Sequence, residues 1–349
     1  MQFVDIVGII IIILIVLLVI IGCFYLITKE NAIVLLTAKI IPDMVEETPK
    51  KTFVFVGDIM MDRGVEYEIK KNNNNYSYPF EKISEFLNDF DIVFGNLEGP
   101  IVENPPVYSD SSFRFAFNKL VATALSEAGF NVVSLANNHT DNMLGDGLAQ
   151  TRKFLNQSDI SYVGEPVGCS YDSILKKQGI VFLAFNKTYL HNCSQSQLIN
   201  AIKEAREQNK EQFLIVSIHW GEEYKLVASE QQQELAHLFV DAGADLIIGH
   251  HPHVTQNIEI YKNKLIFYSL GNFIFDQYFS KDTQQGLAVK VELLKNKAIY
   301  YLHPILTGTA QPFLMEKIEK TQFLEELSSR SSKNLINKVR AGKISINSG

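Results

Sequence analysis

Residues 245–254 read DLIIGHHPHV, a short apolar run followed by three imidazoles. The chain has 8 His in all, so a large share of them lies in this one stretch. An apolar run of this length is typical of a buried strand, and the imidazoles follow where that strand would end. Satisfied loop histidines or metal ligands would both explain the pattern, and the neighbouring segments decide between them.

The same pattern of an apolar run ending in polar residues recurs along the chain, and helix-like segments lie between the runs. This alternation predicts an α/β fold of mixed sheets flanked by helices. The other expected strands are residues 52–56, 91–94, 131–135, 213–218 and 265–269, with a later strand pair at 287–294 and 299–306. The expected helices are 119–128, 147–155 and 231–242, the last with Ser229 as its cap.

Nearly every expected strand is followed by a side chain that can bind a metal. Strand ends of an α/β sheet meet at one edge, so these side chains can converge. The residues are Asp58, Glu98, Asn138, His139, His219, His250, His251 and His253. Carboxylate, amide and imidazole ligands suit Mn, Zn, Fe or Mg. Each residue alone has a purely structural explanation, but together they favour a centre with two divalent ions, or one.

Such a centre would support hydrolysis, since metal ions lower the pKa of bound water and clamp the oxygens of a phosphoryl or acyl group. His139 is the candidate general acid. Arg63 is a candidate for binding an anionic substrate, and the alternative is an ion pair with Asp62 or Glu66.

Other polar residues are expected at the mouth of the site. Glu222 and Glu223 either support His219 and the substrate or are solvated loop charges. Asn272 is expected to contact substrate, with Asp276 and Gln277 beside it.

Composition excludes other classes of site. The net charge is -7, with 32 basic and 39 acidic residues, and no basic stripe is present, so we expect no nucleic-acid partner. The 3 Cys form no CxxC pair, which argues against a thiolate zinc site. Cys169 and Cys193 are either paired or free thiols.

The N-terminus predicts a membrane anchor. Residues 6–27 are uncharged and almost wholly apolar, which is long enough to cross a hydrocarbon core of about 30 Å. We expect an anchor at 1–28, a linker at 29–50, the main domain at 51–310 and a solvated helical tail at 311–349. Lysines lie only after the anchor, so charge alone would place the domain in the cytoplasm.

Seven sequence blocks in order resemble the CapA family of poly-γ-glutamate capsule synthesis proteins, which are similar to calcineurin-like metallophosphoesterases. The blocks are VGDIMMDRG, FGNLEGPIV, FRFAF, GFNVVSLANNHT, IHWGEEY, GHHPHVTQ and YSLGNFIFDQ. The resemblance implies a four-layer α/β sandwich, a dinuclear metal site and an anchored domain outside the membrane. It also implies a part in capsule synthesis or export, with an anionic polymer or other capsule-synthesis membrane proteins as partners.

The resemblance also implies roles for single residues. Asp58, Glu98, Asn138 and His219 match metal ligands, His139 matches the acid, and His251 and His253 match the closing His-x-His pair. Whether His250 or His251 is the ligand stays open.

Three residues depart from the family pattern. Met60 replaces a histidine ligand, Asn142 replaces an aspartate, and Leu144 replaces a glycine. A thioether binds hard metals poorly, so one ion is expected to be held weakly. Three functions therefore stay open: a capsule protein with a metal centre, a metal-dependent phosphoesterase acting on an envelope substrate, and a non-catalytic polymer-binding scaffold.

Overall fold

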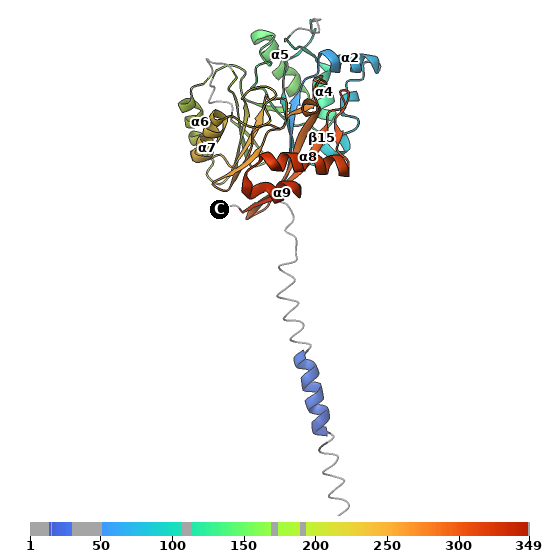
Figure 1. Ribbon diagram of the computed structural model, residues 1–349, viewed down its shortest axis with the longest axis vertical. Helices are drawn as coiled ribbons and strands as arrows, with labels where there is room; N and C mark the ends of the chain where they lie inside the picture. Colours follow the sequence, from blue (N-terminus) through green and yellow to red (C-terminus); the bar gives the residue numbers. More distant parts are fainter. Residues whose placement is uncertain are drawn as a thin grey trace, which may run out of the picture. The chain divides into compact units, whose positions relative to one another are not determined.

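A computed structural model describes residues 14, 16–29, 51–106, 113–168, 174–188 and 193–347 (Figure 1). The chain divides into two compact units, Met1–Thr48 and Pro49–Gly349. In the first unit, residues 16–29 are helical. Within the described residues, no helix combines the length and apolar character needed to cross a membrane. Residues 1–13 and 15 of the expected anchor, and 30–50 of the linker, lie outside the described residues.

The second unit contains a nine-stranded mixed sheet with the order β16-β15-β14-β1-β2-β5-β6, in which β13 also pairs with β1 and β17 with β15. The strands β1, β2, β5 and β6 run parallel, whereas β14 and β15 are antiparallel. Their bounds are β1 (Lys51–Ile59), β2 (Ile92–Leu97), β5 (Val132–Ser134), β6 (Ser161–Val163), β13 (Asn272–Ile274), β14 (Gln285–Leu293), β15 (Lys297–Leu306), β16 (Phe313–Leu314) and β17 (Lys343–Asn347).

A second sheet of six strands has the order β11-β12-β10-β9-β8-β7. Its strands are β7 (Leu175–Lys177), β8 (Ile180–Asn186), β9 (Phe213–His219), β10 (Leu246–His250), β11 (Ile258–Tyr261) and β12 (Lys264–Phe267). The strands β3 (Ile101–Val102) and β4 (Phe117–Asn118) form a separate pair.

The helices lie outside the two sheets. They are α2 (Arg63–Lys71), α3 (Ser84–Leu87), α4 (Leu120–Glu127), α5 (Leu144–Gln157), α6 (Gln195–Gln208), α7 (Glu230–Ala242), α8 (Lys317–Arg330) and α9 (Ile336–Arg340), with short 3₁₀ turns at Tyr78–Phe80, Asp282–Gln284 and Lys333–Leu335. Ser229 caps α7 through a capping box, as its sequence predicts, and Ser194 caps α6 in the same way.

Successive side chains along a strand point to opposite faces of the sheet, and this shows which layer covers each face. In β1, Val54 and Val56 pack toward α2, α4 and α5, while Phe53 and Phe55 face the second sheet. In β9, Ile215 faces the first sheet, and the residues on either side of it pack against α6 and α7. The unit is therefore layered as helices, sheet, sheet and helices. This confirms the predicted α/β class of mixed sheets flanked by helices.

The predicted solvated tail is wrong, because the C-terminal segment is part of the core. Phe323, Leu324 and Leu327 of α8 are almost wholly buried, and β17 pairs with β15 through residues 343–347. Burying each such side chain contributes about 1.5–3 kcal/mol relative to exposing it. The segment therefore stabilises the sheet on which the site is built.

Candidate metal centre

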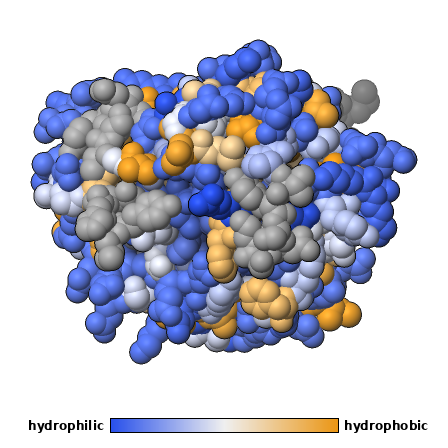
Figure 2. Space-filling view, turned by 90° about the horizontal axis from the view of Figure 1, so that it is seen from above, coloured by the Kyte–Doolittle hydropathy of each residue, from blue (hydrophilic) through white to orange (hydrophobic). Residues whose placement is uncertain are grey.

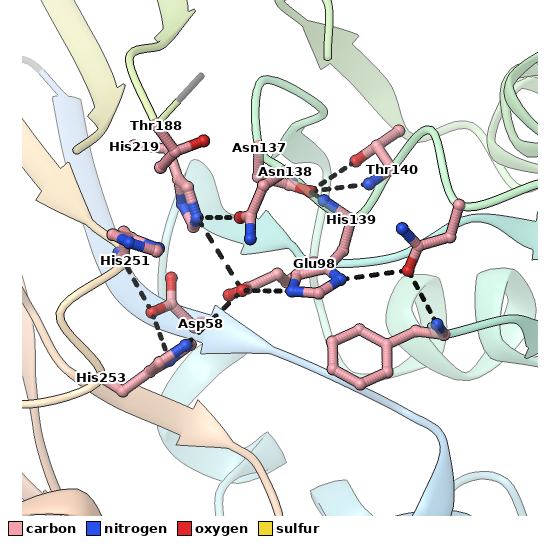
Figure 3. A network of polar contacts seen from close by, with 12 residues as sticks. Asp58, Glu98, Asn137, Asn138, His139, Thr140, Thr188, His219, His251 and His253 are labelled. Carbon is pink, nitrogen blue, oxygen red and sulfur yellow. Dashed lines mark hydrogen bonds and ion pairs between the residues drawn. The ribbon is translucent and has the colours of Figure 1, made fainter. Parts of the chain in front are cut away.

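The carboxyl ends of β1, β2, β9 and β10 bring the expected ligands together (Figure 3). In the register of the sheets Asp58 lies beside Asn96, and His250 lies beside His219. Glu98 follows β2 directly and its backbone N–H donates to the Ile59 carbonyl at 2.9 Å. The sequence-predicted ligands thus converge through strand pairing and not through a single flexible loop.

Two glycines allow this convergence. A Cβ at Gly57, just before Asp58, would lie 1.8 Å from the Gly271 carbonyl oxygen. A Cβ at Gly249, just before His250, would lie 1.9 Å from the Tyr268 carbonyl oxygen. Neither approach tolerates a side chain, so the segment at 268–271 can press against both strand ends only because these residues are glycine.

Glu98 lies at the middle of the cluster. Its Oε1 is 3.9 Å from His139 Nε2, 3.8 Å from His219 Nε2 and 3.7 Å from His253 Nε2. The Glu98 side chain is fully buried and this oxygen has no hydrogen-bond partner. Buried polar atoms are normally satisfied, so an oxygen surrounded by imidazole nitrogens beyond hydrogen-bond range indicates a place for a cation.

Asp58 is held from several sides. Asn96 Nδ2 donates to its Oδ1 at 2.8 Å, His250 Nδ1 lies 3.3 Å from Oδ1, and His253 Nδ1 lies 3.3 Å from Oδ2. Neither ring nitrogen of His250 makes a hydrogen bond, although the ring is buried. The choice between His250 and His251 therefore stays open on geometry, since His251 Nδ1 is also buried without a partner.

His219 and Asn138 face each other at the rim of the Glu98 carboxylate. His219 Nε2 lies 2.7 Å from Asn138 Oδ1, and its Nδ1 lies 3.2 Å from Asn96 Nδ2. The loop carrying Asn138 is fixed by its neighbour Asn137, whose Nδ2 donates to Asn96 Oδ1 and to the Leu97 carbonyl. Sequence reasoning missed Asn96 and Asn137, although each stands next to or near a predicted ligand.

Two groups of ligand atoms among the described residues are compact enough to hold an ion. We call Asp58, Glu98 and His253 the inner group and Glu223, His251 and His253 the outer group. In each group the ligand atoms lie within 4.8 Å of one another. All members of the inner group are buried, whereas Glu223 of the outer group is exposed. His253 belongs to both.

The backbone is strained at two of the candidate histidine ligands. His251 has φ 96° and His253 has φ 57°, a region that non-glycine residues seldom adopt. Such residues cost about 1–3 kcal/mol each and cluster at functional sites. With this backbone the His251 ring lies close to the His219 ring, with 4.8 Å between the ring centres.

The electrostatics of the inner group also favour a cation. Burial and the charge of Asp58 raise the pKa of Glu98 well above its usual range. Burial opposes ionisation of Asp58 as well, but the imidazoles of His250 and His253 outweigh it and hold the pKa of Asp58 well below its usual range. Burial disfavours the charged form of His253, yet Glu98 and Asp58 raise its pKa to about 9. A divalent ion would relieve the same crowding of negative charge.

His139, the candidate general acid, is held between an amide and an aromatic ring. Burial lowers its pKa to about 4, and its Nδ1 lies 3.0 Å from Asn142 Oδ1, which can only accept. Its ring packs on Phe115 at 4.2 Å. Burial thus favours the neutral ring, and its Nε2 is the nitrogen that lies 3.9 Å from Glu98 Oε1.

Arg63, the first of the three expected substrate-binding residues, lies at the start of α2. It forms an ion pair with Asp276, and not with Asp62 or Glu66, and its guanidinium lies 4.8 Å from the Phe115 ring centre. Asp62 instead caps α2 and accepts from the Arg63 backbone N–H. Arg63 lies near the site but already has an anionic partner.

The other two expected substrate-binding residues, Glu222 and Asn272, differ sharply in burial. The Glu222 side chain is 75% exposed and lies 3.3 Å from Lys225, so it is a solvated loop charge. Asn272 is buried, because β13 pairs with β1 and places it beside Asp58. Its Oδ1 lies 3.0 Å from His253 Nδ1 and its Nδ2 donates to the Thr283 carbonyl. Asn272 therefore orients His253.

Comparison with known proteins assigns the chain to a family. Residues 52–277 match the family described as bacterial capsule synthesis protein PGA_cap. The chain belongs to this family. The matched range contains every expected ligand, whereas β14, β15 and the buried C-terminal segment lie beyond it.

Two relatives are similar over most of their length. The capsule biosynthesis protein CapA of Bacillus anthracis is 32% identical, over 89% of this chain and 80% of that protein. The PGA biosynthesis protein CapA of Bacillus subtilis (strain 168) is 30% identical, over 85% of this chain and 84% of that protein. Among solved structures, purple acid phosphatase PPD1 from yellow lupin is 11% identical with a TM-score of 0.36, covering 76% of this chain and 53% of that one.

Within this PGA_cap member, Met60 takes no part in the centre. Its sulfur accepts from the Asp62 backbone N–H at 3.1 Å, and its side chain is fully buried in the core beside α2. The position therefore supplies packing and no ligand, as a thioether in this family position predicts.

The surface around the centre is mainly hydrophilic. Figure 2 views the end of the domain that bears α2 and α5, and apolar areas are scattered between polar ones there. Tyr224 and Phe279 are exposed on this side and pack edge to face at 5.3 Å, with the Tyr224 ring 6.4 Å from His253. They form an aromatic margin to the outer group.

Proposed function

We propose that this protein acts in the synthesis or export of a capsular polymer of the poly-γ-glutamate type, through a divalent-metal centre that hydrolyses a phosphoester bond. The buried, unpartnered Glu98 Oε1 facing three imidazole nitrogens carries the proposal. Membership of the PGA_cap family supplies the biological context.

The donor set fits Mn, Zn, Fe or Mg, because it consists of carboxylates, imidazoles and an amide oxygen. The residues that would hold the metal are Asp58, Glu98, Asn138, His219, His251 and His253. When bound, the metal would supply an activated water and charge stabilisation at the reacting group. Asn96 and Asn272 would orient the ligands Asp58 and His253, and Arg63 would stand nearest to an incoming anion.

The location is also part of the proposal. We infer a single-pass membrane protein anchored by residues 6–27, with the main domain outside the cytoplasm. Cys193 takes part in a disulfide, which supports this placement because disulfides persist in oxidising compartments. Cys169 lies outside the described residues, and Cys23 is free. Protease treatment of intact cells should remove the domain, and a protected domain would show the topology to be reversed.

A second candidate function is a metal-dependent scaffold that binds polymer without hydrolysing it. Met60 and Asn142 favour it, since Met60 supplies no ligand and Asn142 gives His139 Nδ1 an amide partner instead of a carboxylate. Turnover of an aryl phosphoester by the metal-loaded domain distinguishes the two. If turnover is absent while His253→Ala still abolishes surface polymer in a complemented deletion strain, the scaffold is favoured.

The first test is the metal content of the domain by elemental analysis, wild type beside His253→Ala. We expect about two equivalents, or about one if the outer group is weak, and their loss in the variant because His253 belongs to both groups. His237→Ala is the matched control, since His237 pairs with Glu259 away from the centre. Wild-type protein that stays folded without binding added Mn or Zn would refute the proposal.

A further inference from the structure

A second candidate binding site lies at the opposite edge of the sheets from the metal centre. A cavity of about 670 Å³ is lined by Lys51, Ile180, Phe213 and Lys264, which lie at the starts of β1, β8, β9 and β12. The metal centre lies where β1 and β9 end. In Figure 1 the C-terminal end of the chain is at this side, near α9, and Asn347 lines the cavity.

The charge of the cavity is opposite to that of the chain. Its five basic residues against two acidic ones leave an excess of three positive charges, on a chain whose net charge is -7. The basic residues are Lys51, Arg206, Lys210, Lys264 and Lys295, and the acidic ones are Glu211 and Asp245. Concentrated positive charge in a concave surface attracts anions.

Only some of these cations are free to act on a ligand. Arg206 and Lys264 both pair with Asp245, and Arg206 also donates to the Gly243 carbonyl. Among the described residues, Lys210 and Lys295 have no ion pair and are exposed. The cavity therefore offers separate lysine ammonium groups and no unengaged guanidinium fork.

The remaining wall is apolar. Leu294, Ala298, Tyr300 and Ile346 line the cavity and are themselves largely buried, at the point where the space between the two sheets reaches the surface. The volume is in the range of small-ligand sites, about 300–1,000 Å³. A ligand that fits is an anion with an apolar part.

We propose that this cavity binds the phosphate headgroup of an anionic membrane lipid. Separate lysines bind phosphate as point charges, whereas planar carboxylates are best held by a free guanidinium fork, which is absent from the described wall. Lys51 opens the domain directly after the segment that leads from the expected anchor. The site is independent of the metal centre and its activity.

Vesicle co-sedimentation tests the proposal. Residues 49–349 form a compact unit that contains all three hydrophobic clusters, so this domain should fold alone. We expect it to bind vesicles that contain phosphatidylglycerol and to ignore vesicles of phosphatidylcholine alone. The double variant Lys210→Gln/Lys295→Gln should bind about thirtyfold more weakly, the effect of two lysines close to an anionic surface.

Matched variants separate the cavity from overall charge. Lys203→Gln/Lys317→Gln removes the same charge from exposed positions outside the cavity and should bind as wild type does. Glu211→Gln removes an acid from the lining and should strengthen binding. Glu207→Gln removes an exposed acid outside the lining and should leave binding unchanged.

Two results would overturn the proposal. Equal weakening by both double lysine variants would show that overall charge attracts the vesicle. Tight binding of glycerol phosphate in solution, without any preference for phosphatidylglycerol vesicles, would assign the cavity to a soluble phosphate ester instead of a lipid. The substituted side chains are exposed, so loss of folding does not obscure either result.

Discussion

The inner and outer groups share His253 but are built by different means. In the inner group Asp58 lies near the end of β1 and Glu98 directly follows the parallel strand β2, and both carboxylates are buried. In the outer group Glu223 is exposed on a loop, and His251 depends on a strained backbone. A ligand set held by strand register is preorganised, whereas a loop must be ordered when the ion binds.

The comparison implies that the two positions differ in affinity for a metal. The inner group contributes two carboxylates whose crowding is relieved by a cation, and the outer group contributes one solvated carboxylate. Met60 supplies a ligand to neither group, because that side chain is committed to the core. One tightly held ion and one exchangeable ion are therefore expected.

Glu98→Gln should have the largest effect on metal binding. It keeps the size of the side chain but removes the central charge of the inner group, so affinity for the tight ion should fall by more than about 100-fold, beyond the 10–100-fold typical of changes behind the ligands. Titration calorimetry with Mn on the metal-depleted domain measures it. Retention of the tight ion would mean that Glu98 is not a ligand.

Glu223→Gln makes the same chemical change in the outer group and should have a smaller effect. Only the weaker ion should be affected, by about tenfold, because an exposed carboxylate is partly screened by water. The same titration should show an unchanged tight site. Glu222→Gln, the adjacent loop charge that pairs with Lys225, is the control and should change neither ion. Weakening of the tight site by Glu223→Gln would contradict the division into two groups.

Without metal, Glu98→Gln should stabilise the fold, although it is the variant that most weakens metal binding. Because the pKa of Glu98 is raised, its ionised form destabilises the fold above its usual pKa of 4.5, and Glu98→Gln should raise the free energy of unfolding at neutral pH by about 1–3 kcal/mol. Urea unfolding in the presence of a chelator measures the gain, which should disappear below pH 4.5, where the carboxyl is protonated in both states. Glu223→Gln should stay within about 0.5 kcal/mol.

The sequence predicts the candidate metal ligands better than the residues that orient them. Strand ends at Asp58, His219 and His250 follow from apolar runs with a polar stop, a local signal. Asn96 and Asn272 could not be assigned in this way. Their roles come from lying beside Asp58 in neighbouring strands, β2 and β13, and that register is set by long-range pairing.

The same distinction applies to the fold. The pattern of strands and helices predicts the α/β class. The strand β17 was not predicted, because only Ile344 and Ile346 of its five residues are buried and its apolar signal is weak. Its edge position on β15 makes a short alternating strand sufficient. The run at 180–185, now most of β8, is continuous in apolar residues and could have been recognised from sequence.

Acid sensitivity offers the smallest and most selective test, at a histidine outside both groups. Burial lowers the pKa of His303 to about 4, from a usual 6.5. The unfolded chain then takes up a proton that the folded chain refuses, so His303 makes stability fall as pH drops from 6.5 to 4. His303→Phe keeps the ring packed on Phe86, 5.0 Å away, and should remove about 1–2 kcal/mol of that fall. Urea unfolding at both pH values, with chelator, should show this flatter dependence, while Mn affinity at neutral pH stays unchanged. An unaltered pH dependence would assign the acid sensitivity to His139, His219 and His251 of the centre, whose pKa values burial also lowers.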